Sequence, residues 1–576
     1  MKLPPKDVHP SNKLRPPKKS SGDPPSDEQI LNLENPLEQL DSSEFQSPEP
    51  HLKSTPDLSI SGEKKAVLVR GLNWLGDSVI SLPALNALKN TEEHEITVLA
   101  RGAGANLYRE IPYLRRVIED QRGFVKRVNL IKALKFLNFP SSILLQNAFG
   151  AALITYLAGI PVRIGYSRDL REKFLTKSLP VGFTNSYTHE VFNYLELVEA
   201  SGVPAPFTFP EIPQSLGTPQ NPQPPNVIPF SPKKSKGFLL TLAPGASFGS
   251  AKRWSALNFA RSAKLILSGH PRGKIVILGG DTEIEDARTV ANNLKGLEVT
   301  NLAGQTNLSQ VMTIFKNSSL VISNDSGLSH LAGALGAPVV VPFGPTNPLT
   351  TGPLGLQHAI ARKAVHCSPC LKRECPLKER ICFTGVTPEL VAFASDKLLE
   401  KTPEPAQKKN WVILTNIPLG VLQTAWEAPP QVDLIIVLPQ ASRLTLPPTR
   451  KSQESFSSAK NNIPLPKGLL MSNTGYLKPA GFFRKIYPVY YFPDGTNPSL
   501  FYRDLSQSLG LSINQTTFIS TEMDALSRVL KLGARAVLTI NDSLSGIPQN
   551  IFQEAILPTI AAPNLQRALE WAGALR

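Results

Sequence analysis

The sequence predicts an α/β protein with two doubly wound domains, a further α/β domain at the C-terminal end and a disordered N-terminal tail. Short apolar runs alternate with amphipathic stretches along most of the 576 residues, which is typical of parallel strands joined by helices. Two proline-containing linkers, residues 204–232 and 401–410, divide this pattern into three parts. A chain of this length is also expected to hold several domains.

Residues 1–62 are expected to be the disordered tail. The first sixty residues contain eleven prolines and few large apolar side chains. Burial therefore cannot offset the entropy that ordering would cost. This start also lacks the apolar segment of a signal peptide.

The charge and the apolar segments limit the partners and the location. The formal net charge is +15, and residues 1–60 carry ten acidic against seven basic residues, so the excess lies in the folded body. The sequence has no basic tail and no basic stretch interleaved with aromatic residues. The charge therefore favours an anionic substrate or membrane surface as the partner, and nucleic acid is not expected. The apolar segment 142–160 is interrupted by Gln146 and Asn147, which favours a strand followed by a helix over a membrane span. A cytoplasmic protein that at most contacts a membrane is expected.

Residues 63–215 are predicted to form the first Rossmann-like domain. Its apolar runs at 66–70, 95–100 and 141–147 indicate buried parallel strands with helices between them. Asp77 follows a glycine between the first strand and an apolar helix. An acid in this position either caps the helix or lies beyond the carboxyl end of the strand, where open α/β sheets bind ligands.

Residues 216–402 are predicted to form the second such domain. Its strands are expected within residues 237–245, 274–280, 320–325 and 338–344. The first three are followed by the loops "ASFGSAKRW", "DTEIED" and "DSGLSHLAGALG". The last loop opens a helix whose N-terminal amides and dipole can hold a phosphate. A single loop of this kind could simply be an ordinary helix cap. Because three such loops follow three strands in turn, a ligand-binding role is favoured over capping alone.

Four segments resemble the ADP-heptose:lipopolysaccharide heptosyltransferases. They are "LVRGLNWLGDSVISLPALNALK", "NAFGAALITYLAGIPVRIGY", "LAPGASFGSAKRWS" and "VISNDSGLSHLAGALGAPVVVPFGPTNP". "PGASFGSAKRW" and a cysteine cluster are similar to the heptosyltransferase II branch. The resemblance covers roughly residues 64–400. It implies a GT-B fold, in which two Rossmann-like domains face each other across a cleft, with the acceptor on the first domain and the nucleotide-sugar on the second.

The resemblance also implies substrates and roles. The donor would be ADP-heptose, the acceptor a lipid-anchored lipopolysaccharide inner core, and transfer would need no cofactor. Asp77 matches the base that takes a proton from the acceptor hydroxyl. Lys252 matches the lysine that neutralises the leaving diphosphate, with Ser247 as a nearby hydroxyl donor. A helix cap and a solvated lysine are the alternatives for Asp77 and Lys252.

Further binding residues follow from the same match. Glu283 is expected to accept hydrogen bonds from ribose hydroxyls, and Glu285 is its rival because the loop register is open. Asp325, Ser326 and Gly327 match the family's contacts to sugar and phosphate. His330, one turn later, either contacts the ligand or packs within the helix.

Two other functions stay open. One is a related nucleotide-sugar transferase that builds a different surface glycan, because phosphate loops specify the diphosphate better than the sugar. The other is a non-catalytic nucleotide-sugar-binding scaffold. A nucleotide-dependent dehydrogenase fits poorly, since no G-x-G-x-x-G with a downstream acid is present and "GAGAN" at 102–106 has the wrong spacing.

All four cysteines lie within sixteen residues, at Cys367, Cys370, Cys375 and Cys382. In a cytosolic chain such a cluster favours metal ligation over stable disulfides. The spacing C-x2-C-x4-C-x6-C is nevertheless not the usual pair of C-x2-C motifs of a zinc site. A structural zinc or iron–sulfur site and paired or free thiols both remain open.

Residues 403–576 resemble HAD-type phosphatases, nearest the small heptose bisphosphate phosphatases. In the register of "WVILTNIPLG", Thr415 and Ile417 replace the nucleophilic and acid/base aspartates, Leu438 replaces the hydroxyl residue, and the lysine falls near Gly495. "STEMDA" at 520–525 replaces the metal-binding motif. Without these carboxylates neither an aspartyl-phosphate nor a magnesium site can form. A catalytically inactive domain kept for folding, docking or ligand binding is expected.

Overall fold

The computed structural model describes residues 65–181, 188–212, 237–355, 357–363, 365–377 and 379–399, together with seven strands, a final helix and a few adjoining residues beyond residue 409. The tail expected to be disordered and most of both linkers lie outside the described residues.

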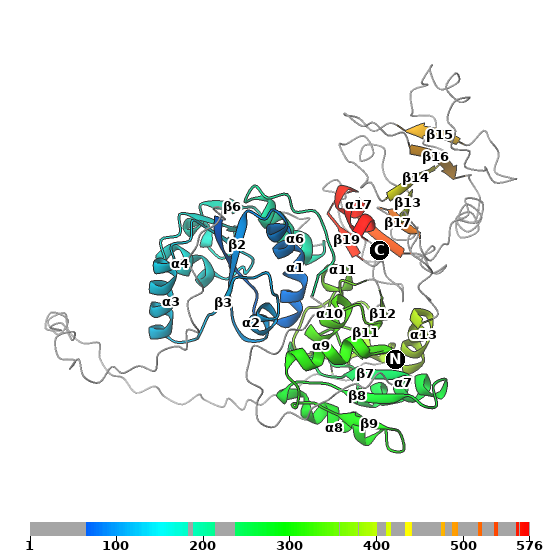
Figure 1. Ribbon diagram of the computed structural model, residues 1–576. Helices are drawn as coiled ribbons and strands as arrows, with labels where there is room; N and C mark the ends of the chain where they lie inside the picture. Colours follow the sequence, from blue (N-terminus) through cyan, green and yellow to red (C-terminus); the bar gives the residue numbers. More distant parts are fainter. Residues whose placement is uncertain are drawn as a thin grey trace, which may run out of the picture. The chain divides into compact units, whose positions relative to one another are not determined.

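The first domain is a six-stranded parallel sheet with the order β3-β2-β1-β4-β5-β6. It is drawn in blue to cyan in Figure 1. Its strands are β1 (Lys65–Arg70), β2 (His94–Ala100), β3 (Arg116–Glu119), β4 (Ser141–Leu144), β5 (Val162–Tyr166) and β6 (Lys177–Leu179). Its helices are α1 (Leu75–Asn90), α2 (Gly102–Arg109), α3 (Phe124–Leu137), α4 (Phe149–Leu157) and α6 (Glu190–Glu199). The three predicted strands are confirmed.

The apolar segment 142–160 is a strand and a helix, as predicted, because it contains β4 and α4. Within the described residues no helix has the length and apolar character needed to cross a membrane.

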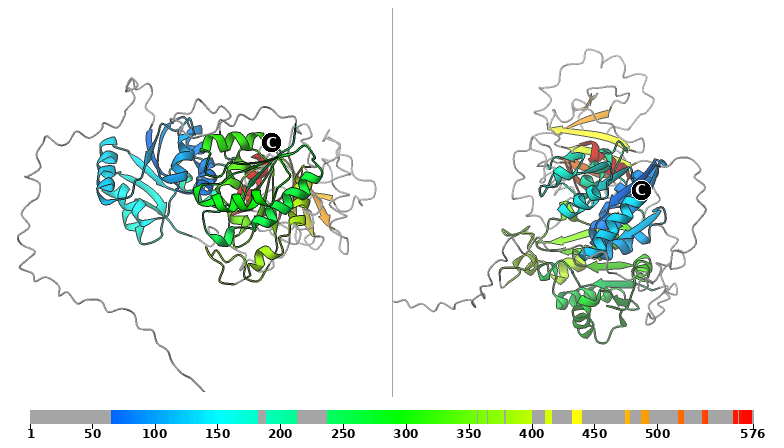
Figure 2. Two further views of the ribbon diagram at one scale, coloured as in Figure 1. Left: turned by 90° about the horizontal axis from the view of Figure 1, so that it is seen from below. Right: turned by 90° about the vertical axis from the view of Figure 1, so that its left-hand side faces the viewer.

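The second domain is also a six-stranded parallel sheet, ordered β12-β11-β10-β7-β8-β9. It is drawn in green in Figures 1 and 2. Its strands are β7 (Leu239–Ala243), β8 (Lys274–Ile277), β9 (Val299–Asn301), β10 (Leu320–Ser323), β11 (Val339–Phe343) and β12 (His358–Arg362). Its helices are α7 (Ala256–Ser268), α8 (Ile284–Asn292), α9 (Leu308–Asn317), α10 (Gly327–Ala334), α11 (Pro348–Thr351), α12 (Ile381–Thr384) and α13 (Pro388–Leu399). The four predicted strands are confirmed, whereas β9 and β12 were not predicted.

The strand order reverses between β1 and β4 in the first sheet and between β7 and β10 in the second. Ligands of open α/β sheets bind at such reversals, beyond the carboxyl ends of the strands. The loop that follows β1 is held firmly, since the Arg70 guanidinium donates to the Leu99 carbonyl (2.7 Å) and pairs with Asp120 (2.8 Å). "GAGAN" lies on α2, where a side chain on Gly104 would collide with the Leu72 carbonyl. This glycine therefore permits close packing.

The third sheet has the order β15-β16-β14-β13-β17-β18-β19, with only β15 antiparallel to its neighbour. Its strands are β13 (Asn410–Thr415), β14 (Val432–Pro439), β15 (Thr474–Leu477), β16 (Tyr487–Phe492), β17 (Thr517–Ser520), β18 (Arg535–Thr539) and β19 (Ile560–Ala562). Of the predicted substitutions at phosphatase positions, Thr415 and Leu438 lie on β13 and β14. Ile417 and Gly495 lie outside the described residues.

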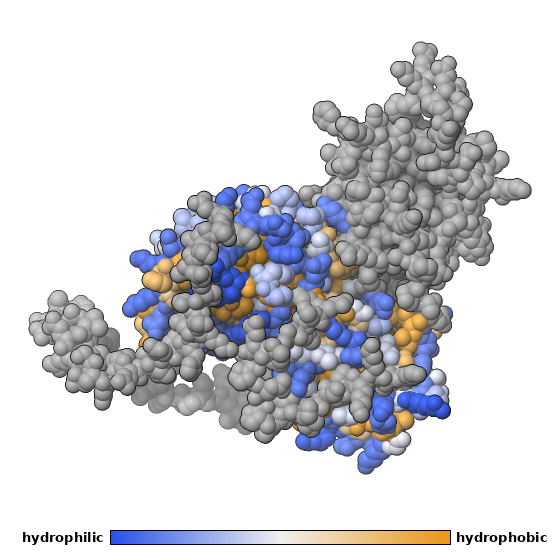
Figure 3. All heavy atoms as spheres, viewed as in Figure 1, coloured by the Kyte–Doolittle hydropathy of each residue, from blue (hydrophilic) through white to orange (hydrophobic). Residues whose placement is uncertain are grey.

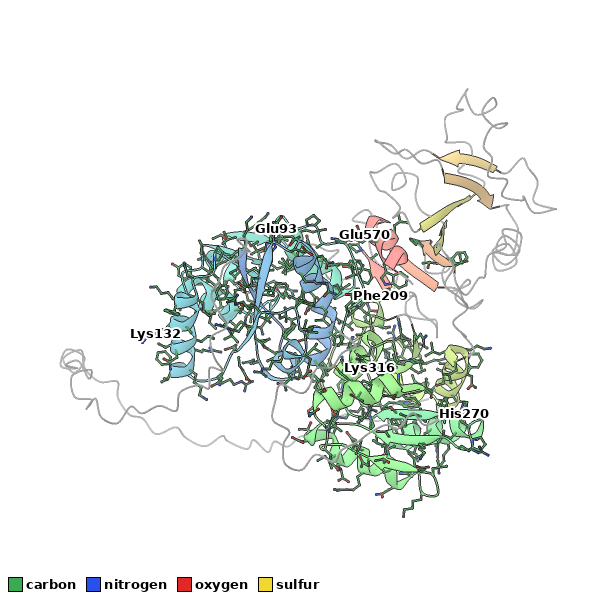
Figure 4. All side chains as sticks on the ribbon, in the orientation of Figure 1. Glu93, Lys132, Phe209, His270, Lys316 and Glu570 are labelled. Atoms are coloured by element: carbon green, nitrogen blue, oxygen red, sulfur yellow. The ribbon has the colours of Figure 1, made fainter. Side chains whose placement is uncertain are left out.

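The final helix, α17 (Leu565–Ala574), packs onto the first domain. Trp571 is 2% exposed and lies edge-on to Phe209, with 6.0 Å between ring centroids. Arg567 pairs with Glu199 of α6 (2.6 Å) and donates to the Ala205 carbonyl (2.8 Å). Figure 4 labels Phe209 and Glu570 at this contact. The C-terminal helix thus completes the core of a domain that lies hundreds of residues earlier in the chain.

Candidate active site

Asp77 lies in the first turn of α1, directly after the loop that follows β1. The N-cap position belongs to Trp74, which makes no side-chain capping bond. The loop is fixed by a hydrogen bond from Ser78 Oγ to the Leu72 carbonyl (3.2 Å) and by one from the Leu72 amide to Tyr108 Oη (3.3 Å). Asp77 therefore has a rigid position without serving as the cap residue.

The surroundings of Asp77 weaken its acidity. Burial raises its pKa to about 6, and the Glu190 carboxylate raises it as well. Lys252 lowers this pKa and Asp325 raises it, which places the two second-domain residues within electrostatic reach of Asp77. A carboxylate with a pKa near 6 is ionised at neutral pH yet remains a useful proton acceptor.

Lys252 and Asp325 form a close ion pair at the reversal of the second sheet. Lys252 Nζ lies 2.6 Å from Asp325 Oδ2, and their side chains are 14% and 3% exposed. The same ammonium lies 4.9 Å from the centroid of the Phe248 ring. Asp325 also accepts a hydrogen bond from Thr346 Oγ1. Lys252 is thus a fixed cation held from two sides, and the solvated-lysine alternative does not describe it.

The start of α10 meets the start of α1. Ser326 is the N-cap of α10. A Cβ atom on Gly327 would lie 2.6 Å from the Leu75 Cβ atom and 3.0 Å from the Gly76 nitrogen. A Cβ atom on Gly76 would lie 2.8 Å from His330 Cδ2. The two glycines therefore let the helix starts of the two domains touch, which brings Asp77 near the Lys252–Asp325 pair.

His330 is packed beneath this contact. It is 5% exposed, and its Nδ1 atom has no hydrogen-bond partner within the described part of the chain. Burial lowers its pKa to about 4, so the ring is neutral at neutral pH. Packing against Gly76 accounts for part of its role, whereas a direct ligand contact stays a prediction.

The two rival glutamates have different surroundings. Glu283 is 6% exposed, and it accepts hydrogen bonds from the Gly280 amide (2.9 Å) and Ser247 Oγ (3.4 Å). Glu285 has a 76% exposed side chain and pairs with Arg288 at 2.6 Å. The structure therefore joins Glu283 to the loop after β7, next to Ser247, and leaves Glu285 in solvent.

Comparisons with known proteins identify the family of this chain. The model of glycosyltransferase family 9 (heptosyltransferase) matches residues 127–381. Lipooligosaccharide heptosyltransferase 2 of Campylobacter jejuni is 31% identical over 335 residues, which cover 56% of this chain and 96% of that protein. This chain belongs to glycosyltransferase family 9.

Two further relatives of this family 9 enzyme are from Escherichia coli. Lipopolysaccharide heptosyltransferase 2 is 28% identical over 313 residues, covering 51% of this chain and 87% of the relative. The solved structure of the E. coli ADP-heptose lps heptosyltransferase II has a TM-score of 0.47 and 23% identity, and covers 58% of this chain and 99% of that chain.

Three residues of the candidate site were not predicted from the sequence. Glu190 begins α6, follows the N-cap His189 and acts electrostatically on Asp77. His189 Nε2 lies 2.9 Å from the Gly352 carbonyl of the second domain. Asn324 is fully buried and ties the end of β10 to the Lys252 loop, accepting from the Trp254 amide (3.0 Å) and donating to the Pro244 carbonyl. In the sequence these residues stand out only as two adjacent polar residues before a helix, His189 and Glu190 in "THEVF" and Asn324 and Asp325 in "SNDSG".

The four cysteines gather in the second domain as free thiols. Burial raises the pKa of Cys382, and Cys367, Cys375 and Cys370 raise it further. No three histidine, cysteine or acidic side chains in the described ranges are arranged to hold a metal ion. The structural metal that the sequence left open at this cluster is therefore unsupported.

Proposed function

We propose that this family 9 enzyme transfers heptose from ADP-heptose to the inner core of lipopolysaccharide, with inversion at the anomeric carbon. The observation that carries the proposal is the meeting of α1 and α10, which places Asp77 within electrostatic reach of Lys252. The relatives' names, heptosyltransferase 2 of lipooligosaccharide or lipopolysaccharide, support the sugar and the acceptor. The contact between two domains, each with its own sheet reversal, supports a GT-B arrangement.

In this mechanism Asp77 takes the proton of the acceptor hydroxyl. The hydroxyl oxygen bonds to the anomeric carbon from the face opposite the diphosphate, and the bond to the diphosphate breaks. A pKa of about 6 suits this step, because the base is ionised at neutral pH and still attracts the proton as it leaves.

The second domain would hold the leaving group. Lys252 neutralises the charge that develops on ADP, and the amides at the start of α10, from Ser326 and Gly327, add their dipoles. Asp325 orients Lys252 and accepts hydrogen bonds from sugar hydroxyls. Glu283 accepts from the ribose, with Ser247 beside it as a hydroxyl donor. The residues themselves supply the compensating charge, so no cofactor is assigned to the transfer.

The acceptor would be lipid-anchored. We therefore infer a cytoplasmic enzyme that works at the cytoplasmic face of the inner membrane, with no nucleic-acid partner. The basic balance of the folded body supports an anionic donor and an anionic surface.

Purified full-length protein incubated with a heptose-deficient core acceptor tests the proposal. Transfer from ADP-heptose but not from other nucleotide sugars is the expected result. Transfer from a different nucleotide sugar would establish the related-transferase alternative. Nucleotide-sugar binding without any transfer would establish the scaffold alternative.

The third domain is proposed to be an inactive HAD-like domain. Its largely parallel sheet with β13 at the centre supports the fold, and the loss of the required carboxylates supports the inactivity. Magnesium-dependent release of phosphate from a heptose bisphosphate by the full chain would contradict it.

A further inference from the structure

Helix α3 has an apolar surface on the side that faces away from its domain. Leu130 and Leu134 are buried against the domain. Val125 and Phe136 are 68% and 88% exposed. Lys132 projects between them, because positions 125, 132 and 136 share one face of a helix. Figure 4 shows Lys132 at the outer edge of α3, pointing away from the sheet.

The charge of α3 has a single sign. The helix contains Lys126, Arg127, Lys132 and Lys135, and it contains no acidic residue. All four side chains are exposed. The surface that carries Val125 and Phe136 is therefore bordered by cations with no anion on the same helix to neutralise them.

Helix α4 extends this surface. It packs against α3 through Leu130, Leu134, Ile154 and Ala158. Its sequence "FGAALITYL" has no charged residue, and Phe149, Tyr156 and Leu157 are between 42% and 49% exposed. Figure 3 shows apolar and hydrophilic residues intermixed over α3 and α4. We call the exposed residues of these two helices the α3–α4 face.

We propose that the α3–α4 face docks this protein onto an anionic lipid bilayer. Apolar side chains can enter the boundary between headgroups and acyl chains while lysine and arginine bind the anionic headgroups. Each basic side chain near such a surface strengthens binding roughly fivefold. Single exposed apolar side chains need no explanation, but aromatic and aliphatic groups bordered by unopposed cations fit this partner.

The proposal rests on the proposed function in one respect, since a lipid-anchored acceptor requires the Asp77 domain to approach a bilayer. A nucleic acid would also attract the cations. The aliphatic Val125 and the uncharged α4, however, offer it no cation, so the bilayer is the favoured partner.

Sedimentation of the full-length protein with lipid vesicles tests the α3–α4 face. The protein is expected to bind vesicles of phosphatidylcholine mixed with phosphatidylglycerol, more weakly at high salt, and to bind pure phosphatidylcholine at least about tenfold more weakly. The double variant Phe136→Ser/Lys132→Glu should lose at least about tenfold in binding. A matched control, Leu265→Ser/Lys264→Glu on α7, likewise replaces an apolar side chain by serine and a lysine by glutamate at exposed positions of the second domain. It should bind like the unchanged protein.

Equal vesicle binding by the Phe136→Ser/Lys132→Glu protein and the control would overturn the proposal. The proposal would also fail if the Phe136→Ser/Lys132→Glu protein kept its vesicle binding but lost binding to duplex DNA, because the face would then be a nucleic-acid surface. Thermal melting verifies that both variants are folded. Transfer onto a water-soluble, delipidated acceptor should be the same in both. If vesicle binding behaves as expected and no transfer occurs, the proposed function fails and the docking surface stands.

Discussion

Asp77 is half-buried beside a second carboxylate, Glu190, and within reach of the Lys252–Asp325 ion pair. Two like charges and low solvation make its ionised form costly, while one cation partly compensates. Such a residue is poorly suited to stabilising a helix and well suited to accepting a proton near neutral pH. Activity and stability are therefore expected to depend on pH near 6.

The transfer rate is expected to rise with pH and level off above about pH 6, because Asp77 must lose its proton before it can act. Asp77→Asn should lower kcat/KM by about 10²–10⁴-fold. The folded-state pKa is raised, so the protein gains stability as pH falls through about 6. Asp77→Asn should accordingly melt at a higher temperature than the unchanged protein at pH 7.5. A variant that retains full transfer activity would contradict the assignment.

Glu190→Gln should move the acidic limb of the pH–rate profile to lower pH. The substitution removes a negative charge that raises the pKa of Asp77, so Asp77 ionises more readily. Glu119→Gln is the control, since Glu119 is an exposed carboxylate of the same domain that pairs with Arg109. A profile that stays in place in Glu190→Gln, as in the control, would show that Glu190 does not tune the base.

Secondary-structure elements determine which of these residues meet. Gly76 and Gly327 let α1 and α10 touch end to end, and a side chain at either position would separate them. Helix α17 also joins parts of the chain that are remote in sequence. Its residues Trp571 and Arg567 pack against α6 and the segment 203–212. One helix start and one terminal helix thus connect parts of the chain that are remote in sequence.

Trp571→Ala is expected to destabilise the first domain by about 3–5 kcal/mol, the usual cost of removing a buried tryptophan from a core. Chemical denaturation measures the loss, and hydrogen exchange should become faster in α6. Phe393→Ala on α13 is the control, because Phe393 is 54% exposed and its removal should cost within about 0.5 kcal/mol. Unchanged exchange in α6 would mean that α17 contributes only to the third domain.

At the scale of the whole molecule, the proposed transfer needs both Rossmann-like domains together, because the donor would be held on the second domain and the base would lie on the first. His189 Nε2, 2.9 Å from the Gly352 carbonyl, adds a second link between them. A ligand at the second sheet reversal should therefore stabilise the folded protein as a whole.

ADP is expected to raise the melting temperature without any divalent metal, since Lys252 and the start of α10 supply the positive charge. A concentration 100-fold above Kd stabilises by about 2.7 kcal/mol. Lys252→Ala should remove most of this effect, and EDTA should not change it. A melting temperature that responds to ADP only with added magnesium would overturn the proposed neutralisation by Lys252.

Local pattern determined much of this protein. The apolar runs predicted the central strands because burial on both faces leaves a continuous signal, and the polar loops after them located Asp77, Lys252 and Glu283. Tertiary structure alone showed that Glu283 is buried and Glu285 exposed, because this difference depends on which side of a short turn packs against the loop at Gly245. It also decided the docking of α17, the approach of Glu190 to Asp77 and the contact between the starts of α1 and α10 at Gly76 and Gly327. The contact of Glu283 with Ser247 spans 36 residues and the other contacts span more than 100. A pattern with a period of two to four residues carries no information at such distances.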